Sequence, residues 1–243
     1  MALLEWHNVT IEKDKQTAAE TDDESGIAPI ETRLRHNILH LPPEIQEATG
    51  IVVYGRRIKS LLFSTDIAVI KNCDADAIFC VHPFTAQRAI ISSVIRVADA
   101  PVFCGAGGGT TQGDRAVNMA LDAENQGAMG VVFNAPIPNC DLEAAARVLD
   151  IPIVVTIPSL RTDVAKRLES GATILNVAGG AKTAEIVAAI RAKHPHVPIM
   201  ASGGKTGDTI RATIEAGANA IVYTPPSSGE LLRDMMDGYR ENL

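Results

Sequence analysis

The sequence predicts an α/β fold, a closed (β/α)8 barrel preceded by an N-terminal extension. Short apolar runs rich in Val and Ile alternate with amphipathic helical patterns at a spacing of roughly 20 to 30 residues, as in successive strand and helix units. There are eight such runs, at 58–65, 76–83, 101–106, 130–135, 152–157, 172–178, 198–203 and 220–225. Amphipathic segments such as 85–98 and 182–194 lie between them and are expected to cover the barrel.

The junctions that lead into these strands alternate in composition. The second, fourth, sixth and eighth strands follow small-residue pairs, at 74–75, 127–128, 171–172 and 217–218, where Gly suits a left-handed helix end. Pro101, Pro152 and Pro198 open the third, fifth and seventh strands, a position that tolerates the missing N–H. A period of two units favours a closed barrel, in which odd and even strands fill alternate layers. An open doubly wound sheet is the alternative.

The first 50 residues do not follow the repeat. We divide the chain into an extension at 1–50, partly flexible and a candidate oligomer contact, and a barrel at 51–243. The charged stretch 10–26 is typical of a linker, whereas 34–50 carries enough Leu and Ile to pack under the barrel or against another subunit. The run IVVYGRRI is expected to form a hairpin that leads into the first strand.

Composition excludes several classes of function. A formal net charge of −7 disfavours nucleic acid as a partner. The four cysteines show neither CxxC nor zinc spacing, so we expect reduced thiols and no metal. No leader and no apolar run near the ~20 residues of a membrane span is present, so we predict a cytoplasmic protein without a membrane partner.

The site is expected at the carboxyl ends of the strands, where barrels of this type carry their active-site loops. Ser202, Gly203 and Gly204 end the seventh strand, and Ser227 and Ser228 lie where the last helix begins. Backbone N–H groups unshielded by a Cβ, together with a helix N-terminus, suit a phosphate group. The alternative is that the glycines form a tight turn and Ser227 is an N-cap.

Candidates for acid–base chemistry are Asp66, His82 and Lys205, because each can carry a proton at the barrel mouth. Histidine titrates near neutral pH, although a lone His often only bonds a neighbour, and Asp66 is equally placed to cap a helix. Asn134 and Asn176 can orient a hydroxyl or carbonyl group.

Two further features of the sequence lie at strand ends. Cys104 is a candidate nucleophile, with buried packing as the alternative. The loop 105–114, GAGGGTTQGD, matches no nucleotide motif, and we interpret it as a mobile lid or a plain loop.

From about residue 58 to residue 240 the chain resembles the phosphate-binding (β/α)8 barrels, including thiazole synthase, phosphoribosylanthranilate isomerase and antiterminator-related proteins of the glycerol uptake operon. The segments ASGGKTGDTIRATIEAGANAIVYTPPSS and GATILNVAGG carry this resemblance, which implies that Gly179 and Gly180 also contact phosphate. The chain is also similar to uncharacterised bacterial barrels, some labelled hydrolases. Pro225 and Pro226 stand where flavin-binding members have Gly-Arg, and the central strands lack a Schiff-base Lys, so no cofactor is expected.

These features lead to three functional hypotheses. The first is an enzyme that binds a small phosphorylated metabolite, or phosphate ion, and moves a proton next to a carbonyl group, as isomerases and lyases do. The second is a non-catalytic ligand sensor that uses the same pocket, and the third is a hydrolase of unknown substrate. In each case a homo-oligomer is expected.

Overall fold

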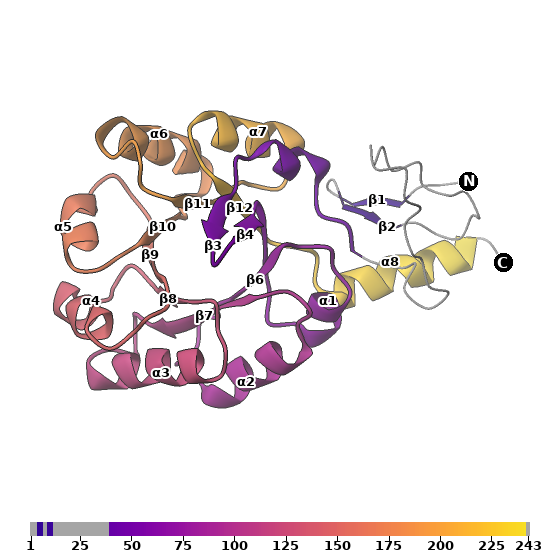
Figure 1. Cartoon of the computed structure of the whole chain (residues 1–243). Coiled ribbons are helices and arrows are strands. Elements are labelled where there is room, and N and C mark those ends of the chain that lie inside the picture. Colours follow the sequence, from indigo (N-terminus) through magenta and orange to yellow (C-terminus); the bar gives the residue numbers. More distant parts are fainter. Residues whose placement is uncertain (1–3, 7–8, 12–38, 242–243) are drawn as a thin grey trace.

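Eight parallel strands close into a barrel in the computed structural model, which describes residues 4–6, 9–11 and 39–241 (Figure 1). The strands are β5 (Ser60–Phe63), β6 (Ala77–Cys80), β7 (Val102–Gly107), β8 (Gly130–Phe133), β9 (Ile153–Ile157), β10 (Ile174–Val177), β11 (Ile199–Ser202) and β12 (Ala220–Tyr223). Strand β12 pairs in parallel with β5, which closes the barrel. The predicted fold is confirmed, and the open sheet is wrong. Each predicted run overlaps one of these strands, and only β7 extends beyond its run, by one residue.

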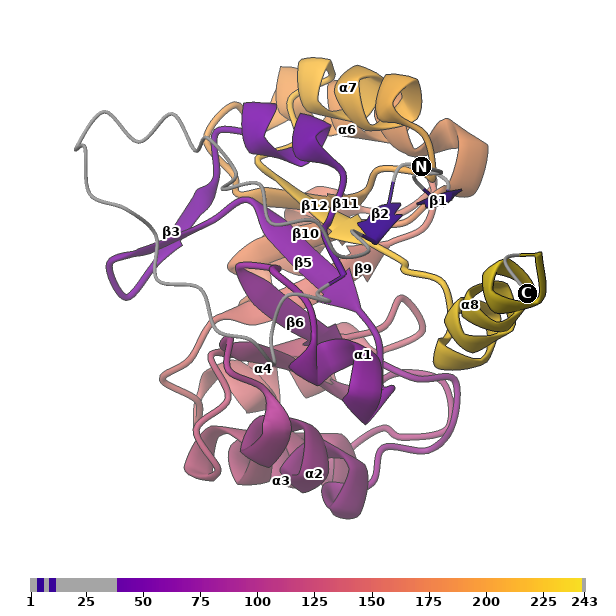
Figure 2. The same cartoon turned by 90° about the vertical axis from the view of Figure 1, so that its right-hand side faces the viewer.

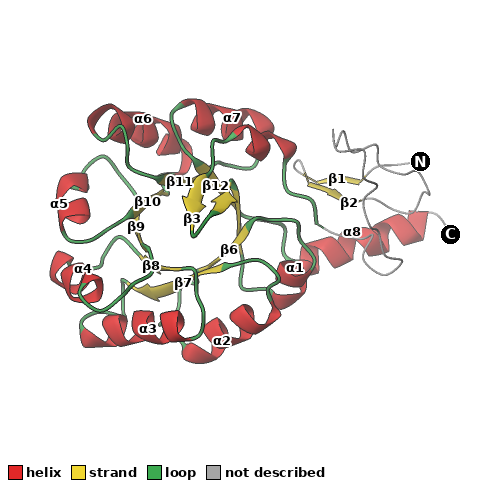
Figure 3. Ribbon diagram, in the orientation of Figure 1, coloured by secondary structure: helices red, strands yellow, loops and turns green. Residues whose placement is uncertain are grey.

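Helices follow the strands, and α1 to α7 form a layer around the barrel (Figure 3). They are α1 (Ile67–Lys71), α2 (Arg88–Val97), α3 (Asp114–Asn125), α4 (Asn139–Ala146), α5 (Val164–Glu169), α6 (Thr183–Lys193), α7 (Gly207–Glu215) and α8 (Ser228–Glu241), with the 3-10 helices η1 (Pro43–Glu47) and η2 (Gly180–Lys182). Strands β1 (Leu4–Trp6) and β2 (Val9–Ile11) form a separate antiparallel pair. No helix in the described ranges combines the length and hydropathy that crossing a membrane requires.

Alternation along the strands divides the apolar residues between two cores. Phe79, Phe103 and Met200 belong to the cluster that fills the barrel interior. Residues of opposite parity, such as Ile78 and Leu175, belong to the cluster between the sheet and the helices. Successive side chains of a strand point to opposite faces, and each fully buried Leu, Ile or Phe stabilises the fold by about 1.5–3 kcal/mol. The interior is therefore a packed core and not a channel.

The junctions explain the two-unit period of the sequence. Gly127, Gly171 and Gly217 have φ of +93°, +107° and +108°, the left-handed conformation that was predicted for the helix ends. The pair at 74–75 is different, because the Asp74 carboxylate accepts hydrogen bonds from the Leu41 N–H and the His40 ring. The Asp74 side chain thus connects that junction to the N-terminal segment.

A β-hairpin plugs the amino-terminal end of the barrel. Strand β3 (Ile51–Val53) pairs antiparallel with β4 (Arg56–Ile58), which confirms the predicted hairpin. Tyr54 and Gly55 both have positive φ, 48° and 78°, as the tight turns of two-residue hairpins require. Ile51, Val53 and Ile58 are buried in the interior cluster. This end of the barrel is closed by apolar packing, which leaves the opposite end for a site.

Residues 39–50 run between α1 and α7. Leu39 forms a bridge to Cys73 after α1, and η1 packs on α7, where Arg211 pairs with Glu44 and Glu47. Helix α8, in contrast, runs outward from the barrel (Figure 2). The described part of the segment predicted at 34–50 therefore packs on the flank of the barrel and not under it. The predicted linker lies mostly in 12–38, outside the described residues, and self-association stays a prediction.

We expect the N-terminal segment to contribute to the stability of the barrel. Ile45 is 0% exposed, so Ile45→Ala removes buried apolar contacts and should lower the free energy of unfolding by about 2–5 kcal/mol. Leu160→Ala is the control, because Leu160 is 54% exposed and its loss should cost less than about 0.5 kcal/mol. Urea unfolding measures both variants. Equal midpoints would show that 39–50 is not part of the cooperative core.

Candidate functional site

Eight positions form what we call the mouth ring, the last inward-facing residue at the carboxyl end of each strand. The register places them: Thr156 pairs with Asn176, and Ser202 pairs with Val222 of the interior cluster. Continuing this alternation gives the ring as Phe63, Val81, Gly105, Asn134, Thr156, Asn176, Ser202 and Thr224. Side chains that can form hydrogen bonds occupy β8 to β12, which we call the polar arc. Apolar residues and glycine occupy β5 to β7.

Asn176 lies at the centre of the polar arc and is 4% exposed. Its Nδ2 donates to Thr156 Oγ1 at 3.3 Å, a contact between neighbouring strands that orients the amide. The Asn176 Oδ1 atom is buried and accepts no hydrogen bond from the described residues. Buried polar atoms are nearly always satisfied, so this atom is a candidate acceptor for a hydrogen bond from a water or a ligand.

His82 and Asn134, both predicted site residues, line the same small cavity. The cavity has a volume of about 20 Å³ and also contacts Val81, Phe84 and Gly108. His82 Nδ1 is buried and has no partner among the described residues. The volume suits about one water molecule or one oxygen of a ligand. A proton-carrying ring and an amide therefore reach one polar space at the mouth.

The loop 105–114 forms a wall of this cavity. Strand β7 carries an irregularity between Gly105 and Gly107 in its pairing with β8, which bends the strand end. Gly107 packs so close to Ala116 and Phe133 that a Cβ would collide with them. Thr111 is buried, and its hydroxyl accepts the Ala86 N–H at 3.2 Å. The glycines are explained by close packing here, and movement of the loop as a lid stays a prediction.

Asp66 caps two helices. Its Oδ1 accepts the N–H groups of Ala68 and Val69 at the start of α1, and its Oδ2 accepts the Ser228 N–H at the start of α8, at 3.3 Å. The hydrogen bond with the Ser228 side chain, followed by burial acting in the opposite direction and by the backbone N–H groups, holds the pKa of Asp66 below its usual value. An ionised capping carboxylate is a poor proton donor at neutral pH.

The turns predicted to bind phosphate differ in whether their N–H groups already donate hydrogen bonds within the chain. Gly204 has φ +84°, and the exposed Gly204 and Lys205 N–H groups donate to no acceptor in the described structure. The Ser227 N–H and hydroxyl both donate to Glu230, at 2.8 and 2.7 Å. These bonds, the backbone one first, lower the pKa of Glu230. At α8 two carboxylates, from Asp66 and Glu230, therefore stand where an anion would bind.

The other residues predicted to contact phosphate are Gly203, Gly179, Gly180 and Ser202. Gly203 packs against Ile221, and Gly179 against Ile186, so closely that a Cβ would collide. The Gly179 N–H donates to Thr183 Oγ1 at 3.1 Å, while Gly180 has φ +60° and open space around it. Ser202 belongs to the mouth ring. Contact of these residues with phosphate stays a prediction.

Cys104 lies opposite Cys80 on the neighbouring strand, and both thiols face the outer core. Burial raises the pKa of Cys80 to about 11 and raises that of Cys104 further. A thiol that stays protonated is a weak nucleophile, so the structure favours packing for Cys104.

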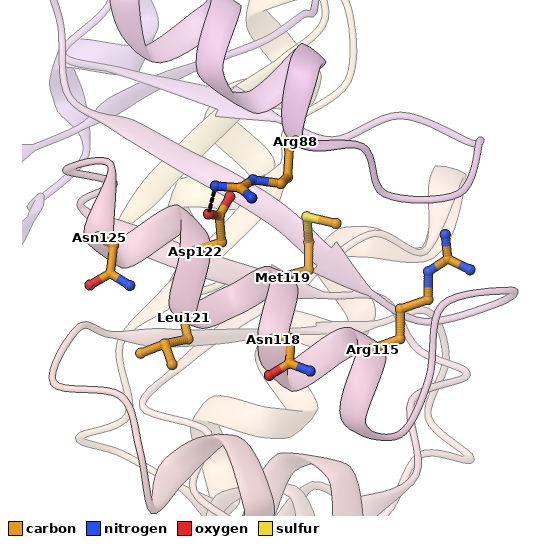
Figure 4. A pocket seen from close by; sticks show the side chains of 7 residues that line it. All are labelled: Arg88, Arg115, Asn118, Met119, Leu121, Asp122 and Asn125. Atoms are coloured by element: carbon orange, nitrogen blue, oxygen red, sulfur yellow. Dashed lines mark ion pairs between the residues drawn. The ribbon is translucent and has the colours of Figure 1, made fainter.

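A larger hollow lies on the outer wall, away from the mouth (Figure 4). It has a volume of about 540 Å³ and runs along α3 beside the start of α2. Arg88 and Asp122 form an ion pair across it. The other lining side chains are Arg115, Asn118, Met119, Leu121 and Asn125. The hollow brings together none of the predicted site residues.

The donor set of the mouth does not suit a metal ion. Within the described ranges no three His, Cys, Asp or Glu side chains lie close enough together to hold one. The polar arc itself offers neutral amides and hydroxyls, whereas divalent cations in proteins are bound mainly through carboxylates, imidazoles or thiolates.

Sequence reasoning missed one residue that shapes the site. Glu230 closes the capping box that begins at Ser227, and the spacing Ser-x-x-Glu was a usable signal. The Thr156 contact with Asn176 could not be found in this way, because the two residues meet only through strand pairing.

Comparisons with solved structures agree on the fold. A 2,3-dimethylmalate lyase of the PEP mutase/isocitrate lyase superfamily has a TM-score of 0.59 and 12% identity, over 82% of this chain and 84% of its own. A phosphonopyruvate hydrolase in complex with oxalate and Mg²⁺ has a TM-score of 0.58 and 12% identity, over 78% and 82%. A dihydrodipicolinate synthase of Agrobacterium tumefaciens has a TM-score of 0.52 and 15% identity, over 74% and 71%.

These identities establish similarity of fold alone. The chain matches no protein-family model, and no curated protein is recognisably similar to it in sequence. The resemblance to a (β/α)8 barrel is confirmed, while the nearer resemblance to thiazole synthase and the antiterminator-related proteins stays a prediction.

Asp66 should make the stability of the chain depend on pH. Its pKa is lowered in the folded state, so its contribution is complete above the unfolded value of about 3.9 and is lost as the pH falls through the lower folded value. Thermal unfolding of Asp66→Asn should therefore differ most from wild type above the unfolded pKa, and the difference should shrink as the pH falls below it.

The matched control for this prediction is Asp163→Asn, because Asp163 caps only α5, through the Lys166 N–H. It should show a smaller change across the same pH range. A difference between Asp66→Asn and wild type that is constant from neutral to acidic pH would contradict the assigned role of the charge.

Proposed function

We propose that this chain is an enzyme of the isomerase or lyase type that binds a small phosphorylated metabolite at the barrel mouth. In this proposal His82 carries the proton, Asn134 orients the reacting oxygen, and the Gly204–Lys205 turn binds the phosphate. The supporting observation is the buried, unpartnered His82 Nδ1 in a cavity that Asn134 also lines. A general acid or base has to be within hydrogen-bond reach of the reacting group, and this cavity provides that reach.

The reaction that suits these groups is proton transfer next to a carbonyl. Neutral His82 accepts a proton from the carbon beside the carbonyl, and the electron pair of the broken C–H bond moves to the carbonyl oxygen. The Asn134 amide N–H donates a hydrogen bond to this oxygen as its negative charge develops. If the carbon that loses the proton also carries a hydroxyl group, this hydroxyl passes its proton to the former carbonyl oxygen, and return of the proton from His82 to the former carbonyl carbon gives the isomer. If the β carbon carries a leaving group, the carbonyl re-forms, the leaving group departs with its bonding electron pair, and a lyase reaction results. Neither outcome needs a metal ion or a cofactor in the scheme.

The solved structures of similar fold are consistent with this class. The named relatives include a lyase, a synthase and a hydrolase of a phosphonate. Barrels of one architecture host many chemistries, so the likeness supports the proposal through the position of the site at the strand ends and not through the reaction.

A ligand sensor is the second candidate. One observation favours it: none of the mouth ring positions carries an ionisable side chain, and His82 stands beside the ring without a charged partner in the described structure. Binding without turnover needs no more than this. A hydrolase of unknown substrate is the third candidate, and the same assays address it.

Substitution of His82 distinguishes these candidates. His82→Gln keeps a polar side chain of similar size and removes the imidazole that transfers the proton in this proposal, so turnover should fall by about 10²–10⁴-fold while ligand affinity changes little. The substrate is first found by ligand-dependent thermal unfolding against sugar phosphates and other phosphorylated metabolites, and turnover is followed by exchange of carbon-bound protons in D₂O. His196→Gln, on the surface, is the control. Unchanged exchange in His82→Gln would reject His82 as the proton carrier.

Two variants test the phosphate turn. Lys205→Gln removes an exposed charge beside Gly204, and it should weaken binding of inorganic phosphate about 3- to 10-fold at low salt. Glu230→Gln removes a carboxylate at the start of α8, and it should strengthen phosphate binding if the Ser227 and Ser228 N–H groups take part. Titration calorimetry measures both variants. If neither substitution alters the affinity, the phosphate is not bound at these turns.

A further inference from the structure

The polar arc contains a buried acceptor atom that has no hydrogen-bond partner among the described residues. Asn176 is 4% exposed. Its Nδ2 donates a hydrogen bond to Thr156 Oγ1, while its Oδ1 accepts none from the described residues. A buried acceptor that forms no hydrogen bond destabilises the fold by a free energy comparable to that of a lost hydrogen bond. The atom can be satisfied by a donor, an O–H or N–H group, that enters the mouth from outside.

The two sides of the mouth ring differ in chemistry. In the closed strand order β6 lies four strands from β10, so Val81 stands across the barrel from Asn176. Phe63 and Val81 are partly buried and pack on the interior cluster, on the side without polar groups. A ligand in the ring therefore meets hydrogen-bonding groups on one edge and an apolar surface on the other.

The absence of charged side chains in the mouth ring favours an uncharged ligand group. The ring positions on β8 to β12 are two asparagines, two threonines and one serine, which are neutral at all ordinary pH values. Burial of an ionised group without a counter-charge is costly, whereas a hydroxyl loses little when it finds a hydrogen-bond partner. Carbon skeletons that carry several hydroxyl groups combine polar edges with apolar C–H surfaces.

We infer that the mouth ring binds the uncharged, hydroxyl-bearing part of the ligand, a sugar or polyol moiety, and that Asn176 Oδ1 accepts one of its O–H groups. Thr156 is a positioning residue that fixes the Asn176 amide. The inference rests on the proposed function only in placing the ligand at the mouth. It adds the chemical class of the part that enters the barrel, and it holds whether or not the ligand also carries phosphate.

The test uses the whole chain and separate probes for the two parts of the site. D-ribose, D-glucose and glycerol are titrated as neutral probes, and inorganic phosphate is titrated alone, each by calorimetry and by the shift in melting temperature. At least one neutral probe should bind wild-type protein. Asn176→Leu should weaken that binding about 2- to 10-fold, the effect expected for one neutral hydrogen bond, and should leave phosphate binding unchanged.

A second variant separates the roles of the two amide atoms. Asn176→Asp keeps an acceptor oxygen for the ligand and replaces the N–H donors by a second oxygen, to which the Thr156 hydroxyl can donate, so it should retain binding of the neutral probe. Asn118→Leu is the matched control, because Asn118 is exposed on the outer wall. Should Asn176→Leu fail to fold, Asn176→Ser shortens the same side chain and serves in its place.

Each outcome decides the inference. Binding of phosphate without any neutral probe overturns it and leaves the proposed function standing. Binding of a neutral probe that Asn176→Leu weakens and Asn176→Asp retains supports it, even if phosphate does not bind and the phosphate part of the proposed function fails. Equal binding to wild type and Asn176→Leu, loss of binding in Asn176→Asp, or no binding of any probe each overturns it.

Discussion

The strand register of the closed barrel is the constraint on which the rest of the structure depends. Because side chains alternate along each strand, one choice of register sends Phe79, Phe103 and Met200 inward and commits the residues between them to the outer core. The interior then fills with apolar side chains, and the hairpin at 51–58 closes one end. Polar inward-facing residues are left only at the opposite end, so the site follows from the packing.

Carboxylates of the chain itself occupy the helix starts around the mouth. Asp66 accepts N–H groups from both α1 and α8, Glu230 closes the capping box of α8, and Glu44 lies against Gly207 at the start of α7. Helix N-termini carry unpaired donors and partial positive charge. Asp66 and Glu230 accept hydrogen bonds from such donors, whereas Glu44 lies close to the start of α7, which Thr206 caps. Carboxylates that stabilise these helix starts therefore also disfavour the binding of an anion there. The Gly204–Lys205 turn differs, because its N–H groups donate to no carboxylate in the described structure.

The N-terminal segment changes how the barrel is covered. In the regular repeat each strand is followed by a helix that packs on the sheet, but α8 runs outward and residues 39–50 lie between α1 and α7 (Figure 1). Ile45 and Leu39 are buried there, so this segment covers the part of the barrel that α8 does not cover. The start of α8 nevertheless stays at the mouth through Ser228 and Asp66. The outward helix is thus connected to the mouth through the Asp66 carboxylate, and Leu231 of the same helix packs on the outer core.

The fold could be predicted because its signals are local. The alternation of Val-rich and Ile-rich runs with helical patterns, and the glycines at 127, 171 and 217 with positive φ, depend only on neighbours in sequence. Residue types at the strand ends also named His82, Asn134 and Asn176 as candidates. The role of Asp66 was left open between base and cap, since a side chain in that place suits both until its partners are known.

The sequence by itself determined the barrel, the end of it where the candidate residues lie, and the kinds of side chain found there. Only the tertiary structure decided which of them meet. Thr156 orients Asn176 from another strand, Ser228 reaches Asp66 across 162 positions of the chain, and His82 shares its cavity with Asn134 of a strand two places away. The physical reason is that strand closure fixes these distances, and closure is a property of all eight strands together and of no single segment.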